Sequence, residues 1–357
     1  MLGKSAQEIF PATACFKGFL HGRSHAATLI RMNARFSEAD FPANGSPRQK
    51  MEFALTYAAL APTGGGWQPW YFQLGEAHID LLAKQDLTRE KADPDRREFM
   101  IGCGSALLYL KQALKHFGCL GRVDLFPDLG QPALVARLNF GSGRERDACE
   151  KRLFEAMPEH RPNGSPLGEP PVTGAMLTAL GHVAAGERGW LDFVRSETGR
   201  QQVLEVALAG SSRSPDRDRP NISLPQATAE RQVARWPRLV FSFGGRGVDV
   251  RNEPVAEPAG PPAVSTATLA VVKTKTDDKH GWLEAGQTMA RTILQAQALG
   301  MSWSFVDSMR RREARAALRT GVGHKGFAQV ILRFGPLIMD DGMAGLGAPV
   351  TAPEIFR

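Results

Sequence analysis

The chain has 357 residues, of which 43% are hydrophobic and 23% are charged. These fractions are typical of a globular protein and exclude wholesale disorder and fibrous repeats. The 44 Lys and Arg residues exceed the 37 Asp and Glu residues, so the formal net charge is 44 − 37 = +7. That excess permits an anionic ligand but does not require nucleic acid. At about 150 residues per domain, the length corresponds to two domains or to one large domain with a duplicated core.

The first 36 residues contain five Lys and Arg residues against the single acid Glu8. We interpret this stretch as a soluble basic arm, although a basic bias is also a feature of transit peptides. No apolar run reaches the roughly 18 residues of a membrane helix. The four cysteines form no Cys-x-x-Cys pair and have no zinc-type spacing with His, so we expect a reducing cytoplasmic location and no bound metal.

In the first part of the chain, apolar spacing predicts a helix over residues 48–61, which Pro62 ends. A hairpin is predicted around Gly75, and Asp93-Pro94 is typical of a helix start. That second helix runs to Gly118. The strands predicted in this part cover residues 70–74, 78–82, 122–126 and 134–140.

The same order of elements recurs later in the chain. A helix beginning near Trp282 carries Gly286 and Gly300, which repeat the 14-residue spacing from Gly104 to Gly118. The elements predicted after it are a strand over residues 302–306, an Arg-rich helix over 309–318 and a strand over 328–335. We interpret the pattern as two related α+β halves.

The predicted organisation has three parts: an N-terminal arm over residues 1–47, a first half over 48–150 and a second half over 151–357. Residues 211–235 and 253–267 in the second half are rich in charged residues or proline. Long loops of this kind in a compact enzyme are typical of lids.

Residues 61–70, with the sequence Ala-Pro-Thr-Gly-Gly-Gly-Trp-Gln-Pro-Trp, resemble the Ala-Pro-Ser-x-x-Asn-x-Gln-Pro-Trp segment of the nitroreductase superfamily. Residues 93–104 are similar to the Asp-Pro-x-x-Arg…Cys-Gly stretch of its Acg-type branch. Residues 157–166 stand where that branch has a Pro-x-Arg-His-Thr-Asn-Arg-Arg-Pro run, and residues 282–286 resemble its Trp-Leu-x-Ala-Gly helix start. The resemblance covers about residues 48 to 335.

The resemblance implies an α+β, three-layer sandwich in which two fused halves form a pseudo-dimer that binds FMN at their interface. It implies an enzyme that moves a hydride through flavin N5 to or from a small organic substrate, with NAD(P)H as a candidate electron donor. No side chain needs to act as a nucleophile. The expected state is a monomer or a homodimer, without a membrane or a nucleic-acid partner.

The resemblance also implies one composite cofactor site, since each half has only part of it. A glycine-rich turn lets the backbone approach a flat ring, and a phosphate favours Arg side chains, hydroxyls and backbone N–H groups. The residues expected to line the ring are Pro62, Thr63, Gly64, Gly66 and Gln68, with Asp307 and Ser308 beneath it. Those expected to hold the phosphate are Arg161, Asn163, Ser165 and Arg333.

Several positions depart from the family pattern. Gly66 replaces an Asn, Gly164 and Ser165 replace two Arg, and Pro353-Glu354 stands where Arg is expected. Each lost charge-assisted bond to phosphate is worth about 1.5–3 kcal/mol. Two alternatives therefore stay open: a cofactor-free relative with a binding, storage or scaffold role, and a protein that binds an anionic partner such as nucleic acid.

Other features are interpreted as structural. The run Arg310–Arg312, with Arg315 and Arg319, is typical of a solvated helix face, and a phosphate clamp or an anionic partner surface is its alternative. Gly244–Gly247 lacks the spacing of a phosphate loop and is interpreted as a turn. No histidine has a nearby acid and nucleophile that would suggest a triad.

Overall fold

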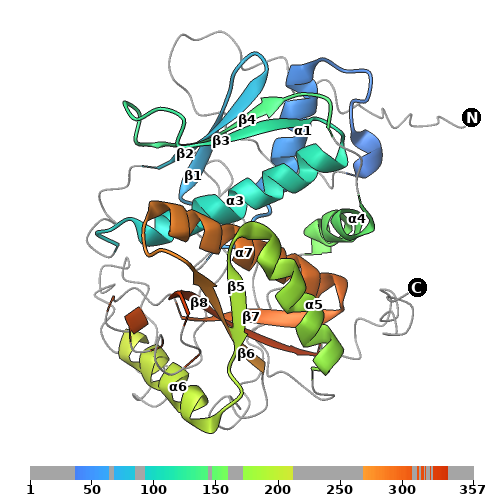
Figure 1. Cartoon of the computed structure of the whole chain (residues 1–357). Coiled ribbons are helices and arrows are strands. Elements are labelled where there is room, and N and C mark those ends of the chain that lie inside the picture. Colours follow the sequence, from blue (N-terminus) through green and yellow to red (C-terminus); the bar gives the residue numbers. More distant parts are fainter. Residues whose placement is uncertain are drawn as a thin grey trace, which may run out of the picture.

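The computed structural model describes residues 37–63, 68–84, 93–143, 147–159, 172–211, 268–307 and 325–336, together with residues 312, 315, 316, 318 and 322. Two four-stranded antiparallel sheets form its frame, and two long helices lie between them (Figure 1). The observed class is α+β, and the layers run sheet, helices, sheet, as predicted.

The first half begins with the 3-10 turn η2 (Glu38–Asp40) and helix α1 (Pro47–Ala58). Ser46 caps α1, because its hydroxyl accepts the N–H of Gln49 and Pro47 takes the first helical position. The sheet has the order β1-β2-β4-β3. The remaining elements are β1 (Trp70–Leu74), β2 (His78–Ala83), α3 (Arg97–His116), β3 (Leu120–Leu125), β4 (Leu134–Phe140), α4 (Ala148–Glu155) and η4 (Met157–Glu159).

The second half repeats this topology, since its sheet has the order β5-β6-β8-β7. Its elements are α5 (Gly174–Ala184), η5 (Ala185–Glu187), β5 (Trp190–Phe193), α6 (Glu197–Ser211), β6 (Thr268–Thr274), α7 (Lys279–Ala298), β7 (Met301–Asp307) and β8 (Phe327–Pro336). Apart from α6, which has no counterpart in the first half, the order helix, two strands, long helix, two strands is the same in both.

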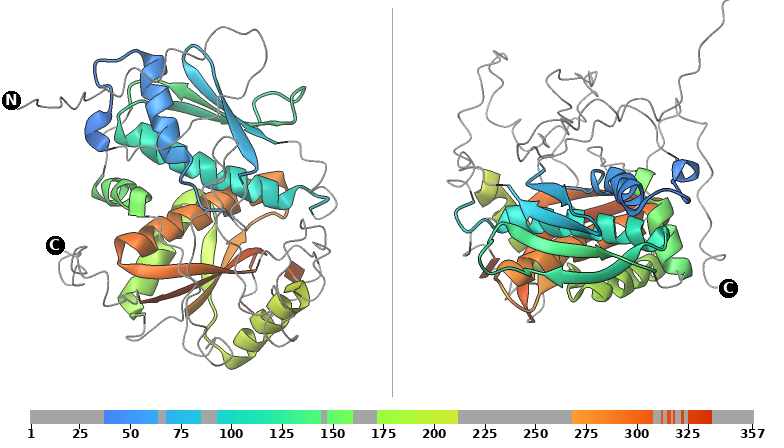
Figure 2. Two further views of the ribbon diagram at one scale, coloured as in Figure 1. Left: turned by 180° about the vertical axis from the view of Figure 1, so that it is seen from behind. Right: turned by 90° about the horizontal axis from the view of Figure 1, so that it is seen from above.

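Helices α3 and α7 are each 20 residues long and pack against each other between the sheets. The view from behind in Figure 2 shows the same pair separating the two sheets. Gly104 and Gly286, each the eighth residue of its helix, lie at the crossing. A Cβ atom at Gly104 would overlap the carbonyl of Leu283, and one at Gly286 would overlap that of Ile101. Only glycine allows the two backbones to approach so closely.

Both long helices end in the same way. Gly118 has φ +65° and Gly300 has φ +69°, so each provides the left-handed residue that closes a helix and starts the next strand. The predicted 14-residue repeat between glycines is therefore a repeat of the helix crossing and of the helix end.

The helix pair also joins the two cores. Leu283, Ala290 and Leu294 of α7 pack into the core of the first half, while Ile101 of α3 packs into the core of the second. Helix α6 lies on the other face of the second sheet, where its Val203 and Val206 form a third cluster with strand residues. Within the part of the chain that the structure describes, no helix is both long enough and apolar enough to span a membrane.

Most predicted elements are confirmed within a few residues. Helix α1 ends earlier than predicted, and α7 begins at Lys279, ahead of Trp282, because Asp278 accepts the N–H groups of His280 and Gly281. Helices α4, α5 and α6 and strands β5 and β6 were missed. Ser211, the first residue of one predicted loop, is the last residue of α6; residues 212–235 and 253–267 lie outside the described residues.

Cys103 and Cys119 are buried and free, as expected for small core residues. Burial raises the pKa of the Cys103 thiol to about 12. His116 is also structural, because its buried ring stacks on Phe154 with centroids 3.5 Å apart. Neither cysteine is therefore poised as a thiolate nucleophile.

Candidate functional site

The glycine-rich loop that follows α1 is anchored at both of its ends. The hydroxyl of Ser105 in α3 donates to the carbonyl of Pro62 (2.7 Å). The side-chain amide of Gln68 donates to the carbonyl of Ala59 at the end of α1 (2.9 Å). Thr63 is partly buried beside Pro62, whereas Gly64 and Gly66 lie outside the described residues. The loop is thus fixed to α1 and α3 on either side of its three glycines.

A polar cluster joins the halves at the start of α3, and we call it the junction cluster. It contains Arg97 from α3, Gln329 from β8, Trp282 from the first turn of α7, Asp277 from just before that helix, and Arg315. Arg97 and Arg315 are only 2% and 3% exposed. Burial of two guanidinium groups in one place is costly unless they are hydrogen-bonded, so their partners define the cluster.

Arg97 reaches across the interface to a single residue of the other half. Its Nε and Nη2 atoms donate to the Oε1 atom of Gln329 (3.1 and 2.9 Å), and Nη2 also donates to the Gln329 carbonyl. The amide nitrogen of Gln329 in turn donates to Thr274 (3.0 Å) and to Asp277 (3.2 Å). Gln329 therefore fixes α3 to β8 and to the start of α7.

Asp277 is the acceptor at the centre of the junction cluster. It accepts from the indole N–H of Trp282 (2.7 Å) and from Nη2 of Arg315 (3.0 Å), besides Gln329. Burial alone would raise the pKa of Asp277, but the bond from Trp282 and the charge of Arg315 outweigh it. The pKa of this carboxyl therefore lies below its ordinary value.

The start of α3 depends on Asp93, whose carboxylate accepts the backbone N–H groups of Arg97 (2.9 Å), Glu98 (2.8 Å) and Phe99 (3.2 Å). Burial and the nearby charge of Glu98 raise the pKa of Asp93, although the three N–H donors act in the opposite direction. The predicted helix start at Asp93-Pro94 is confirmed, and it holds Arg97 at the interface.

The structure does not bring Arg333 to the α3–α7 pair. Its neighbours Leu332 and Phe334 pack toward the α7 side of the sheet, so Arg333 lies on the opposite face. It is 7% exposed and donates to the Ser304 hydroxyl (3.0 Å), and burial lowers its pKa.

The other predicted contacts are only partly described. Asp307 is the last residue of β7 and pairs with Ile331 of β8. Several predicted contacts lie outside the described residues, namely Ser308, the phosphate run Arg161, Asn163 and Ser165, and the first two residues of the triplet, Arg310 and Arg311. The predicted site residues that the structure does describe therefore fall into two groups, one at the loop after α1 and one in the second sheet.

Sequence reasoning missed the junction cluster. The interpretation of Arg315 as part of a solvated helix face was wrong, because Arg315 is buried against Asp277. The available signal was the resemblance itself: Arg97 is the Arg of the Asp-Pro-x-x-Arg stretch, and Trp282 opens the Trp-Leu-x-Ala-Gly segment. These family motifs hold the two halves together in this structure.

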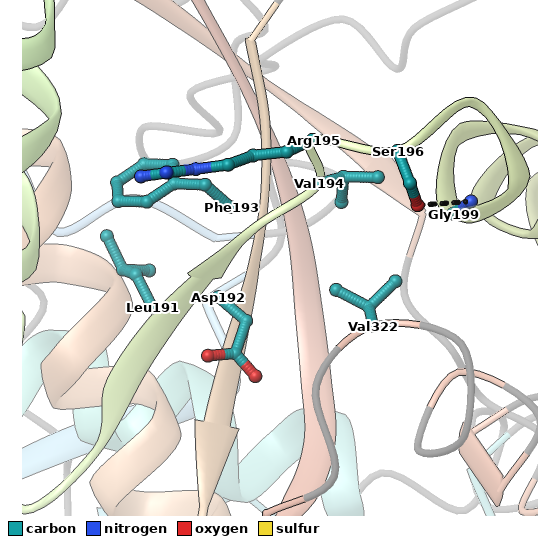
Figure 3. Close-up of a pocket in the computed structure, with 8 residues that line it drawn as sticks. All are labelled: Leu191, Asp192, Phe193, Val194, Arg195, Ser196, Gly199 and Val322. Carbon is teal, nitrogen blue, oxygen red and sulfur yellow. Dashed lines mark hydrogen bonds between the residues drawn. The ribbon is translucent and has the colours of Figure 1, made fainter.

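A cavity of about 420 Å³ lies elsewhere, where β5 leads into α6. Figure 3 shows Asp192, Arg195 and Ser196 around it, with the Ser196 hydroxyl accepting the N–H of Gly199 (3.1 Å). Beside it the buried Lys273 pairs with Asp192 (2.9 Å) and donates to the Val322 carbonyl. None of the predicted cofactor residues that the structure describes lines this cavity.

Comparison with known proteins shows what the chain is similar to. The chain is 25% identical over 327 residues to the Mycobacterium tuberculosis H37Rv protein Rv3131, named a candidate NAD(P)H nitroreductase, covering 85% of this chain and 87% of that protein. The acg protein of the same organism, also named a candidate NAD(P)H nitroreductase, is 25% identical over 163 residues, 46% of this chain and 49% of its own. A solved FMN-bound nitroreductase from Bacteroides fragilis shares 13% identity at a TM-score of 0.34, covering 56% of this chain and 98% of its own.

No family model matches the chain. The two mycobacterial relatives confirm the resemblance to the nitroreductase superfamily and to its Acg-type branch. Over most of its length the chain is therefore similar to proteins named as candidate NAD(P)H nitroreductases.

Proposed function

We propose that this protein is an FMN-dependent oxidoreductase that transfers two electrons, as a hydride, between NAD(P)H and a small organic substrate. The observation that carries the proposal is the loop after α1, which Ser105 and Gln68 anchor on both sides of a three-glycine run. A run of glycines brings no side chains that would block the close approach of a flat isoalloxazine ring.

The residues assigned to the ring are Pro62, Thr63, Gly64, Gly66 and Gln68, with Asp307 and Ser308 on the other side. The Gln68 side chain is already bonded to Ala59, so its contribution is to hold the loop in shape. The loop faces α3, and Asp307 ends a strand of the other half. A ring held between them would be oriented by both halves.

The phosphate is assigned to Arg161, Asn163 and Ser165, with Arg333 as a further predicted contact. Arg333 fits this role least well, because its guanidinium is buried on the face of the second sheet opposite to α7. With few arginines present, we expect the affinity for FMN to be below that of a site with several charge-assisted phosphate bonds.

Bound FMN would supply the hydride-accepting N5 atom, and the chain's own part is to orient the ring and donate backbone hydrogen bonds to it. No side chain is assigned as nucleophile or general base. We also propose a cytoplasmic location and a single polypeptide that acts as a pseudo-dimer. Both predicted divisions fall inside helices: 47/48 follows the first residue of α1, and 150/151 lies within α4, which packs against both α3 and α7.

We infer one FMN per chain. The counterpart of the α1–β1 loop in the second half is the α5–β5 connection, which is short and contains Glu187. Glu187 is buried between Lys111 (2.8 Å) and Arg291 (3.2 Å), and Lys111 also donates to Gln287 (2.9 Å). This ion network fills the symmetry-related position with side chains.

The test is to purify the protein and record the visible absorbance of oxidised flavin before and after addition of FMN. We expect a yellow protein with one FMN per chain that oxidises NAD(P)H when a nitroaromatic compound is present. A colourless protein that does not bind added FMN would contradict the proposal and support the cofactor-free alternative. Steeply salt-dependent binding of DNA without flavin would support the anionic-partner alternative.

A further inference from the structure

Strand β3 forms one edge of the first sheet, whose order is β1-β2-β4-β3. The N–H of Phe126, just after β3, donates to the Val135 carbonyl of β4 (2.9 Å). Because successive residues of an antiparallel strand face its partner alternately, the backbone groups of Val123 and Leu125 point away from β4. Outside the strand ladder, no backbone bond of the described residues uses either of them. The edge therefore offers N–H and C=O groups to a further strand.

The same edge is also apolar and hollowed. The large hydrophobic side chains that are exposed in the described part of the chain are Leu125 (37%) and Leu129 (90%), and both belong to the β3–β4 hairpin. A groove of about 550 Å³ lies here, and its lining includes Arg122, Val123, Asp124 and Leu125, four successive residues of β3. Strand edges of this kind are sites at which another chain adds a strand.

The charges of β3 select the chain that would fit. We propose that β3 pairs with β3 of a second copy of this chain, antiparallel and about a two-fold axis at Val123. In that register Arg122 lies opposite Asp124 of the second copy, and the reverse pair forms by symmetry. These are the positions without backbone bonds, where opposite side chains come closest and opposite charges are favourable. Leu125 lies opposite Gly121, which leaves room for its side chain.

The pair within one chain does not prevent this contact. Nε of Arg122 lies 2.9 Å from Oδ1 of Asp124, but the Arg122 side chain is 79% exposed, and a guanidinium has five N–H donors. The contact is one strand wide, so we expect a weak dimer whose population depends on protein concentration. It is separate from the pairing of the two halves within the chain, and it does not depend on the proposed flavin.

The test is sedimentation velocity of the full chain over a series of concentrations, in which the dimer fraction of the native chain should rise. Arg122→Asp leaves two acids in β3, and Asp124→Arg leaves two bases. Each change sets like charges opposite each other, so each variant alone should associate about tenfold more weakly or less. An equal mixture of the two variants should recover association, because every base then faces an acid. The control is Lys151→Asp, which makes the same charge change at a 64% exposed side chain of α4 and should associate like the native chain.

A native chain that stays monomeric over the whole series overturns the proposal, and so does a mixture that associates no better than its two components. Equal loss of association in Lys151→Asp and Arg122→Asp overturns it as well. If Asp124→Arg does not fold, Val123→Pro replaces it, because proline removes an outward N–H and leaves the ladder with β4 intact. That variant should be monomeric, and association like that of the native chain would overturn the proposal.

Discussion

At the scale of residues, the interface between the halves is held by buried charges rather than by apolar contacts alone. Asp277 is 8% exposed and is the carboxylate that pairs with the buried Arg315. Removal of one member of a buried pair leaves the other charge without compensation, which is why such pairs respond strongly to single substitutions. The effect should be far larger than for ion pairs on the surface.

We predict that Asp277→Asn lowers the free energy of unfolding by about 3–5 kcal/mol, since it leaves the guanidinium of Arg315 buried without a counter-charge. Denaturant unfolding measures this. The control is Asp124→Asn, which removes the partner of Arg122, a side chain that is 79% exposed. That change should cost less than about 1 kcal/mol. Equal losses in the two variants would mean that the junction cluster does not carry the interface.

The same carboxylate makes stability depend on pH. The pKa of Asp277 in the folded chain lies below its ordinary value of 3.8, so its contribution is fully present above that value. It is lost as the pH falls through the lower, folded pKa. We predict that the difference in unfolding free energy between the native chain and Asp277→Asn is constant above about pH 5 and shrinks below pH 4. A difference that stays constant, or that grows on acidification, contradicts the assignment.

At the scale of elements, the crossing of α3 and α7 decides how the two halves fit together. Glycine in the middle of a helix normally costs about 0.5–1 kcal/mol relative to alanine. Gly104 and Gly286 are kept in helix interiors because each lies against the backbone of the partner helix. A carbonyl oxygen of a packed helix cannot move away as a flexible side chain can.

We predict that Gly286→Ala destabilises the protein by about 1–3 kcal/mol, against the usual helix preference for alanine, because the new methyl group overlaps the Ile101 carbonyl. The control is Gly181→Ala within α5, where the nearest atom to a new Cβ, in Phe193, is 4.0 Å away. That change should stabilise the protein by up to about 1 kcal/mol. Thermal unfolding of both variants is sufficient, and a neutral or stabilised Gly286→Ala protein would refute the close crossing.

The elements around this crossing could be predicted, but its side-chain partners could not. The spacing from Gly104 to Gly118 and from Gly286 to Gly300 is local in sequence, so it predicts both helices and their ends. The bond from Arg97 to Gln329 joins residues 232 positions apart, and nothing in the local pattern of either segment indicates it. The burial of Arg315 was not predicted for the same reason. A run of arginines in the sequence indicates a solvated helix face, and the buried partner Asp277 lies in another segment of the chain.

The elements that were missed have a related cause. Helix α5 and strand β5 lie between residues 172 and 196, where the first half offers few matching residues. Their role is clear only from topology, because α5 packs on α7 as α1 packs on α3. The loop after α1 was predicted to be part of the candidate site because its sequence resembles a known segment. The predicted phosphate contacts rest on sequence alone.

At the scale of the whole molecule, the two halves share packed apolar residues and buried ion pairs. Each contributes a helix to the central pair, and residues of α7 belong to the core of the first half. The network of Lys111, Glu187 and Arg291 adds a second polar connection, with exposed side-chain fractions of 18%, 8% and 13%. Neither half can unfold without exposing apolar surface and buried charge of the other.

We predict a single cooperative unfolding transition for the chain, with the same midpoint by fluorescence and by circular dichroism. Glu187→Gln should lower the midpoint of that one transition, at a cost of about 3 kcal/mol, because Lys111 and Arg291 lose their shared counter-charge. The control is Arg188→Gln, whose side chain is 82% exposed and 3.9 Å from Glu284, and which should change stability by less than about 1 kcal/mol. Two separate transitions, or a Glu187→Gln variant in which only one transition shifts, would show that the halves fold independently and that the network is not a connection between them.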